Sequence, residues 1–96
     1  MTTDAAAVLR RALELLGPNG EHWVKFQNHT RHGGFCAFGA LESVYGSKGK
    51  ARNLLLEAAN IDSVINWNDA PERTWPEVKA AFERAIEMAM ETKDGI

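Results

Sequence analysis

The chain has 96 residues, which fits one domain with a single modest core. Charged residues make up 25% of the chain and apolar residues 45%, a composition that excludes wholesale disorder. The net charge is only −2, no apolar run reaches the roughly 18 residues of a membrane span, and no signal peptide is recognisable, so we expect a cytoplasmic protein without a membrane partner.

The order of the segments predicts a mostly α-helical single domain over residues 1–96, with about four helices and two long ordered loops. The first helix begins after Asp4, a good N-cap, and carries apolar residues at helical spacing. Gly17 and Pro18 end it. Residues 21–34 follow as an irregular segment with no evident partner strand for the stretch around Trp23.

The second helix is expected to begin at Phe35 or Cys36 and to run to Tyr45. Gly39 within it indicates that another backbone packs closely there, because glycine destabilises a helix interior. Residues 46–50 are predicted to form a loop. A third helix is predicted over residues 50–60, and it is apolar on more than one face.

Residues 61–73 are predicted to be the second irregular segment. The last helix is expected to start at the capping box Thr74-Trp75-Pro76-Glu77 and to run to Glu91, with Lys79 and Glu83 able to pair across one turn. Because Pro76 cannot lie inside a helix that begins earlier, Asp69 is expected to cap only a single turn before the chain turns again.

Cys36 is a candidate nucleophile, because it lies near a predicted helix N-terminus, where the helix dipole lowers a thiol pKa. An enzyme built on it would use Cys36, His32 and Asp69. However, no histidine follows the cysteine in the chain, and its neighbours Phe35 and Phe38 are typical of a buried structural cysteine. The sequence therefore favours no catalytic residue.

Three histidines and one cysteine lie close together in the sequence and are potential metal ligands. His22, His29 and His32 precede Cys36, but their spacing matches no standard zinc motif, and strong zinc signals contain paired cysteines. We therefore expect no metal and no cofactor.

The charges are unevenly distributed. Residues 22–52 hold five cations and one carboxylate, whereas residues 53–96 hold four cations and nine carboxylates. Arg31, Lys48, Lys50 and Arg52 could contact nucleic acid, but domains that bind nucleic acid are usually strongly basic overall. The sequence favours attraction between the two segments of one fold, and nucleic acid is not the expected partner.

Two short motifs mark the chain: Cys-Ala-Phe-Gly-Ala-Leu at residues 36–41 and Trp67-Asn68-Asp69. They resemble a small uncharacterised domain family of actinobacteria and their phages. Its final helix opens with Arg-Thr, as at Arg73-Thr74, and Phe35 stands where it commonly has Trp. The resemblance covers most of the chain and implies a cytoplasmic accessory protein, encoded by a phage, without implying an activity.

The second motif supplies the candidate binding residues Trp67, Asn68 and Asp69, to which Trp23 is added. In a purely structural interpretation, Trp67 lies in the core against the small residues around Cys36, and Asn68 forms hydrogen bonds to loop backbone groups. The alternative reading is a ligand pocket beside Cys36.

A non-enzymatic interaction protein that binds a host or phage protein is therefore the first functional hypothesis. A Cys36-dependent small enzyme or small-ligand binder is the second, and weak nucleic-acid binding through the basic middle segment is the third. Neither the identity of the partner nor the oligomeric state follows from the sequence.

Overall fold

The structure, a computed structural model, describes residues 5–25, 33–44 and 48–94. Within these residues the chain forms five helices: α1 (Ala5–Leu16), α2 (Ala37–Glu42), α3 (Lys48–Ala59), α4 (Val64–Asp69) and α5 (Trp75–Asp94). The predicted mostly α-helical class is confirmed. The expected N-cap Asp4 lies outside the described residues.

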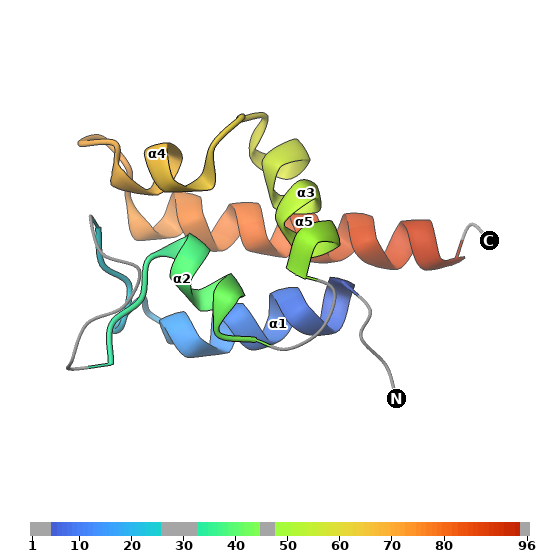
Figure 1. Ribbon diagram of the computed structural model, residues 1–96, viewed down its shortest axis with the longest axis horizontal. Coiled ribbons are helices and arrows are strands. Elements are labelled where there is room, and N and C mark those ends of the chain that lie inside the picture. Colours follow the sequence, from blue (N-terminus) through green and yellow to red (C-terminus); the bar gives the residue numbers. More distant parts are fainter. Residues whose placement is uncertain (1–4, 26–32, 45–47, 95–96) are drawn as a thin grey trace.

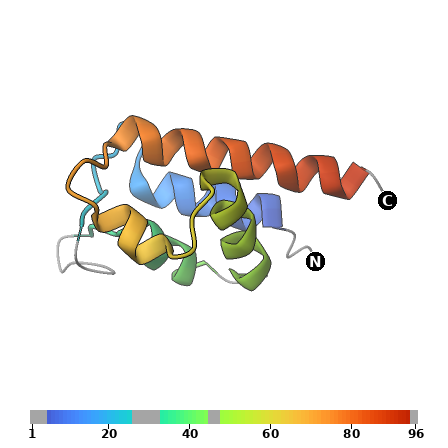
Figure 2. The same ribbon diagram turned by 90° about the horizontal axis from the view of Figure 1, so that it is seen from above.

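Helix α5 organises the fold. Figure 1 shows it running the length of the molecule, with α1 below it and α4 above it, and Figure 2 shows α1 antiparallel beside it. Helices α1 and α5 each contribute an apolar face to one core, because their apolar residues recur at helical spacing. The largest fully buried apolar side chains come from four helices: Leu9, Leu16, Leu41, Leu55, Val78 and Phe82.

Two helix boundaries differ from the predicted ones. Helix α2 ends at Glu42, and Ser43 is its C-cap, with an Oγ that donates to the Gly39 carbonyl at 3.0 Å. Tyr45, the predicted end, lies outside the described residues. Helix α3 begins at Lys48, inside the segment that was predicted to be a loop.

The end of α3 is a left-handed cap at Asn60, whose φ is 58°. The N–H of Asn60 donates to Glu57 O at 3.1 Å and that of Ile61 donates to Leu56 O at 2.9 Å, the two bonds of a Schellman motif. The motif turns the chain sharply, so that residues 60–63 cross to the start of α4.

Helix α4 occupies the segment that was predicted to be irregular, so that prediction was wrong for residues 64–69. Ser63 opens it as N-cap, its Oγ accepting from the Asn66 N–H at 3.2 Å. Asp69 is the last residue of this helix. The prediction that Asp69 would be the N-cap of a single turn was therefore wrong. The turn that follows is closed by the Arg73 N–H, which donates to Ala70 O at 3.0 Å.

Trp23 does have an extended partner, contrary to expectation: a single parallel bridge pairs it with Phe35. The N–H of Phe35 donates to His22 O at 2.7 Å and that of Val24 donates to Phe35 O at 2.9 Å. The bridge brings the segment before residue 26 against the segment that leads into α2.

The predicted start of α5 is confirmed. The Glu77 carboxylate accepts from the Thr74 backbone N–H at 3.0 Å, which is the Glu half of the capping box. The Thr74 hydroxyl also lies 3.3 Å from the same Glu77 oxygen. These bonds hold the pKa of Glu77 below its usual value, with the backbone N–H as the main cause and the nearby Arg73 charge as a further one.

Candidate functional site

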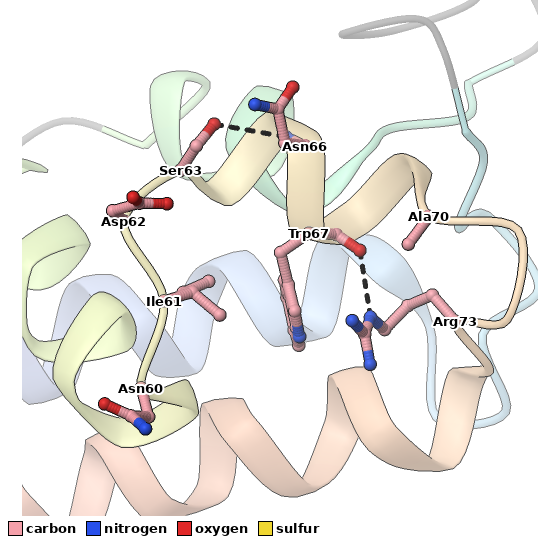
Figure 3. Close-up of a pocket in the computed structure, with 8 residues that line it drawn as sticks. All are labelled: Asn60, Ile61, Asp62, Ser63, Asn66, Trp67, Ala70 and Arg73. Atoms are coloured by element: carbon pink, nitrogen blue, oxygen red, sulfur yellow. Dashed lines mark hydrogen bonds between the residues drawn. The ribbon is translucent and has the colours of Figure 1, made fainter.

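The residues of the Trp67-Asn68-Asp69 motif lie in the last turn of α4 and point in different directions. Asn68 is completely buried, and Trp67 is 7% exposed. Figure 3 shows the Trp67 ring directed toward α5. Asn68, rather than Trp67, is the residue that reaches the start of α2, which corrects the predicted packing of Trp67 around Cys36.

Asn68 is the centre of a hydrogen-bond network with four bonds. Its Oδ1 accepts from the Trp23 indole N–H at 2.6 Å and from the Ala37 backbone N–H at 3.0 Å. Its Nδ2 donates to Val24 O and to Asp69 Oδ1, both at 3.0 Å. A primary amide has two donor hydrogens and two acceptor lone pairs, so these four bonds use its full capacity. The prediction that Asn68 satisfies loop backbone groups is confirmed.

The Asn68 network ties together three segments that are far apart in the chain: the stretch around Trp23, the start of α2, and the end of α4. Three of the four candidate binding residues are joined in this network, because Asn68 bonds directly to both Trp23 and Asp69. Since Asn68 faces inward with all of its polar atoms engaged, its visible role is to join these segments.

Cys36 is the N-cap of α2 and is buried, with 2% exposure. Its Sγ accepts from the Gly39 N–H at 3.3 Å. Burial raises the pKa of the Cys36 thiol above its ordinary value, and the Asp69 carboxylate acts in the same direction, while the Gly39 N–H opposes them. The environment therefore favours the neutral thiol, the less nucleophilic form.

The three candidate catalytic residues can be placed only in part. Cys36 and Asp69 are brought near each other, while His32 lies outside the described residues, as do His29 and Arg31. Of the predicted basic residues, Lys50 and Arg52 are exposed on α3. Within residues 5–25, 33–44 and 48–94, no group of three His, Cys, Asp or Glu side chains is placed to hold a metal ion.

An open groove of about 570 Å³ lies beside α4 and is the main candidate site. We call it the α4 groove, and Figure 3 shows its lining residues: Asn60, Ile61, Asp62, Ser63, Asn66, Trp67, Ala70 and Arg73. They come from the α3–α4 connection, one face of α4 and the turn before α5. Apolar surface from Ile61 and Trp67 is thus bordered by side chains that form hydrogen bonds.

Arg73 forms one wall of the α4 groove and is held in place by three contacts. Its Nε donates to Trp67 O at 2.9 Å, its guanidinium carbon lies 5.1 Å from the centre of the Trp67 ring, and its Nη1 pairs with Glu77 at 3.3 Å. The side chain is only 17% exposed. Sequence reasoning did not single out Arg73 as a site residue, although the Arg-Thr pair that opens the last helix marked its position.

A smaller hollow of about 220 Å³ adjoins the α4 groove and shares Asp62 and Ser63 with it. Ile65, which is 41% exposed, lines this second hollow. The first turn of α4 therefore stands between two depressions, with an apolar side chain on one flank and the Asn66 amide on the other.

These features define a small helical domain, with five helices among its described residues and an open, mixed polar and apolar groove beside a buried asparagine network. The chain belongs to a family of unknown function, DUF6197, whose model matches residues 1–88. No curated protein and no solved structure matches the chain. Across the described residues, the helices are too short or too polar to span a membrane.

Proposed function

We propose that this protein is a non-enzymatic interaction module that binds a protein partner through the α4 groove. The observation that carries the proposal is the form of this surface: an open groove with half-buried Ile61 and Ala70, polar side chains at its border and an anchored arginine as one wall, next to the exposed Ile65 of the adjoining hollow. Protein interfaces combine an apolar centre with a polar rim, and arginine and tryptophan are enriched in them.

The openness of the groove favours a protein segment over a small ligand. Small-molecule sites are usually concave enough to enclose most of the ligand surface. The α4 groove lies open along the side of α4, and the adjoining hollow that Ile65 lines extends the surface around the first turn of that helix. A partner chain can contact both depressions at once, whereas a small molecule would leave one side in water.

The two alternative functions have less support. A Cys36-dependent enzyme needs a reactive thiolate, and the burial that raises the pKa of Cys36 opposes one. Nucleic acid needs clustered cations, but the α4 groove contains one arginine, Arg73, which is paired with Glu77, and the adjoining hollow contains one from the basic middle segment, Arg52, together with Asp62.

The motif resemblance refines the proposal. A protein of an actinobacterial phage would meet a host or phage partner in the host cytoplasm, so we propose that compartment and that origin for the interaction.

The test compares two asparagines that are both exposed on helices. Asn66 lines the α4 groove, whereas Asn53 lies on α3 and lines none of the hollows described. Each introduced arginine has a carboxylate nearby, since Glu57 lies one turn from Asn53 on α3 and Asp62 lines the α4 groove together with Asn66. The wild type, Asn66→Arg and Asn53→Arg are each immobilised and exposed to lysate of the organism that carries the gene, and captured proteins are quantified by mass spectrometry.

The expected result is a partner that the wild type and Asn53→Arg capture equally and that Asn66→Arg loses by about tenfold or more, which corresponds to about 1.4 kcal/mol. The purified partner is then titrated against all three proteins. Equal binding to Asn66→Arg, or no partner common to the wild type and Asn53→Arg, contradicts the proposal. Melting curves of the variants establish that each one is folded.

A further inference from the structure

A second groove, of about 410 Å³, lies between the end of α1 and the start of α5. We call it the α1–α5 groove. It shares no lining residue with the α4 groove, and Figure 1 shows α1 and α4 on opposite sides of α5. Its surface is mostly apolar, with Leu13, Pro18 and Trp75 among its lining residues. A ligand in this groove would therefore leave the α4 groove uncovered.

The Trp75 side chain is held in place by contacts within the protein itself. On one side it meets Gly20, which adopts a φ of 73° and where an added Cβ would lie 2.5 Å from the indole ring. The Trp23 ring lies 6.2 Å away, centre to centre, at an angle of 44°. Trp23 is itself held by its hydrogen bond to Asn68. A rigid aromatic side chain loses little entropy on binding, so Trp75 is suited to be an interface anchor.

The border of the groove carries an excess of positive charge. Arg10 and Lys79 line it together with one carboxylate, Glu14, and Arg11 engages that carboxylate at 3.0 Å. The guanidinium of Arg10 reaches the Met90 sulfur at 3.0 Å. Across the described chain, Lys79 forms no ion pair, so the expected Lys79–Glu83 pair is absent there. Arg10 and Lys79 thus form no ion pair with a carboxylate of the described residues, while the Glu21 carboxylate lies beside Gly17 of the groove and accepts from the Asn19 N–H at 3.0 Å.

We propose that the α1–α5 groove is a second docking site, which takes an acidic segment of a partner protein and seats an apolar side chain of that segment against Trp75. Charge complementarity selects this occupant, because carboxylates that flank the apolar anchor would face Lys79 and Arg10. A symmetric contact with a second copy of the chain would instead bring the same cations toward each other.

The experiment selects a yeast-displayed library of random dodecapeptides on the immobilised full chain. Peptides that bind are synthesised, and their affinities are measured for the wild type, Lys79→Glu and the matched control Lys50→Glu. Both lysines are exposed on helices, but Lys50 lies on α3, outside the α1–α5 groove. Ile65→Asp, beside α4, reports whether a peptide uses the other site.

The expected peptides combine an apolar anchor with aspartate or glutamate. Their affinity should fall about tenfold or more in Lys79→Glu, stay within about twofold in Lys50→Glu and Ile65→Asp, and weaken as salt is added. Selected peptides without acidic bias, equal binding to Lys79→Glu, or no enrichment would overturn the proposal. Sedimentation that shows a dimer broken by Lys79→Glu would also overturn it and assign the groove to a second copy. A loss of affinity in Ile65→Asp instead of Lys79→Glu would likewise overturn the proposal and assign the peptides to the surface beside α4, whereas the other outcomes leave the α4 groove untested.

Discussion

The indole N–H of Trp23 donates to Oδ1 of Asn68 at 2.6 Å, across 45 residues of sequence. This bond connects the loop after α1 with the last turn of α4, and the same oxygen also caps the backbone N–H of Ala37. Lys25 supports the arrangement, since its Nζ donates to Ala70 O at 2.7 Å and lies 5.7 Å from the centre of the Trp23 ring. The buried asparagine thereby links α4, which contributes residues to the α4 groove, with Trp23, whose ring lies 6.2 Å from that of Trp75 in the α1–α5 groove.

Replacing Asn68 should damage the fold severely. Asn68→Ala leaves the Trp23 and Ala37 N–H groups and the Val24 carbonyl without their partner, so we expect a loss of about 3 kcal/mol in the free energy of unfolding. Asn68→Asp keeps the acceptor but turns a carboxylate oxygen toward Val24 O and Asp69, and should be as harmful. Urea unfolding followed by tryptophan fluorescence measures both changes. A loss below about 1 kcal/mol for either variant would show that the network is dispensable.

Trp67→Ala should lower the free energy of unfolding by about 3 kcal/mol or more, because it removes a buried ring and the surface on which Arg73 stacks. Trp67→Phe retains a ring and should lose less. The measurement is thermal and urea unfolding of both variants. A Trp67→Ala protein that melts like the wild type but loses its partner would mean that Trp67 is a binding residue instead of a core residue.

Cys36 should react slowly with thiol reagents near pH 7 in the native protein and rapidly in urea, because burial shields it and raises its pKa. Cys36→Ala should be tolerated with a small loss of stability, whereas Cys36→Asp would bury a carboxylate near that of Asp69 and should lose markedly more. Labelling rates with a chromogenic disulfide reagent test the first point. Native labelling as fast as in urea would restore Cys36 as a candidate nucleophile.

The Thr74–Glu77 cap should contribute stability in a pH-dependent manner. The pKa of Glu77 is lower in the folded chain than in the unfolded chain, so its contribution is present above the unfolded value of about 4.3 and disappears as pH falls through the folded value. The melting temperature of Glu77→Gln should therefore lie below that of the wild type at pH 7, and the two should converge in acid. Thr74→Ala should lose about 1 kcal/mol.

A control for this cap is available in the second half of the same helix. Glu87→Gln, which removes an exposed pair with Arg84 at 3.8 Å, should shift the melting temperature less at pH 7. A gap between the wild type and Glu77→Gln that stays constant down to strongly acidic pH would contradict the assigned cap.

Several elements could be predicted from the sequence because they depend on interactions between residues that are close in the chain. The bond from the Thr74 N–H to the Glu77 carboxylate is formed within four consecutive residues, so it depends little on the rest of the fold. The apolar spacing of α1 and α5 likewise predicts helices that pack by one face. Helix α4 was missed because it has only six residues, although Ser63 followed by Val64 and Trp67 carried a usable signal.

The sequence by itself determined the helical class, the start of α5, and the inward role of Asn68 as a partner for loop backbone. Only the tertiary structure decided which backbone groups Asn68 meets, the direction of the Trp67 ring, and the assembly of both grooves. The physical reason is range: caps and helical spacing act within a turn or two, whereas the Trp23–Asn68 bond and the position of Arg73 depend on segments that meet only after the helices have packed.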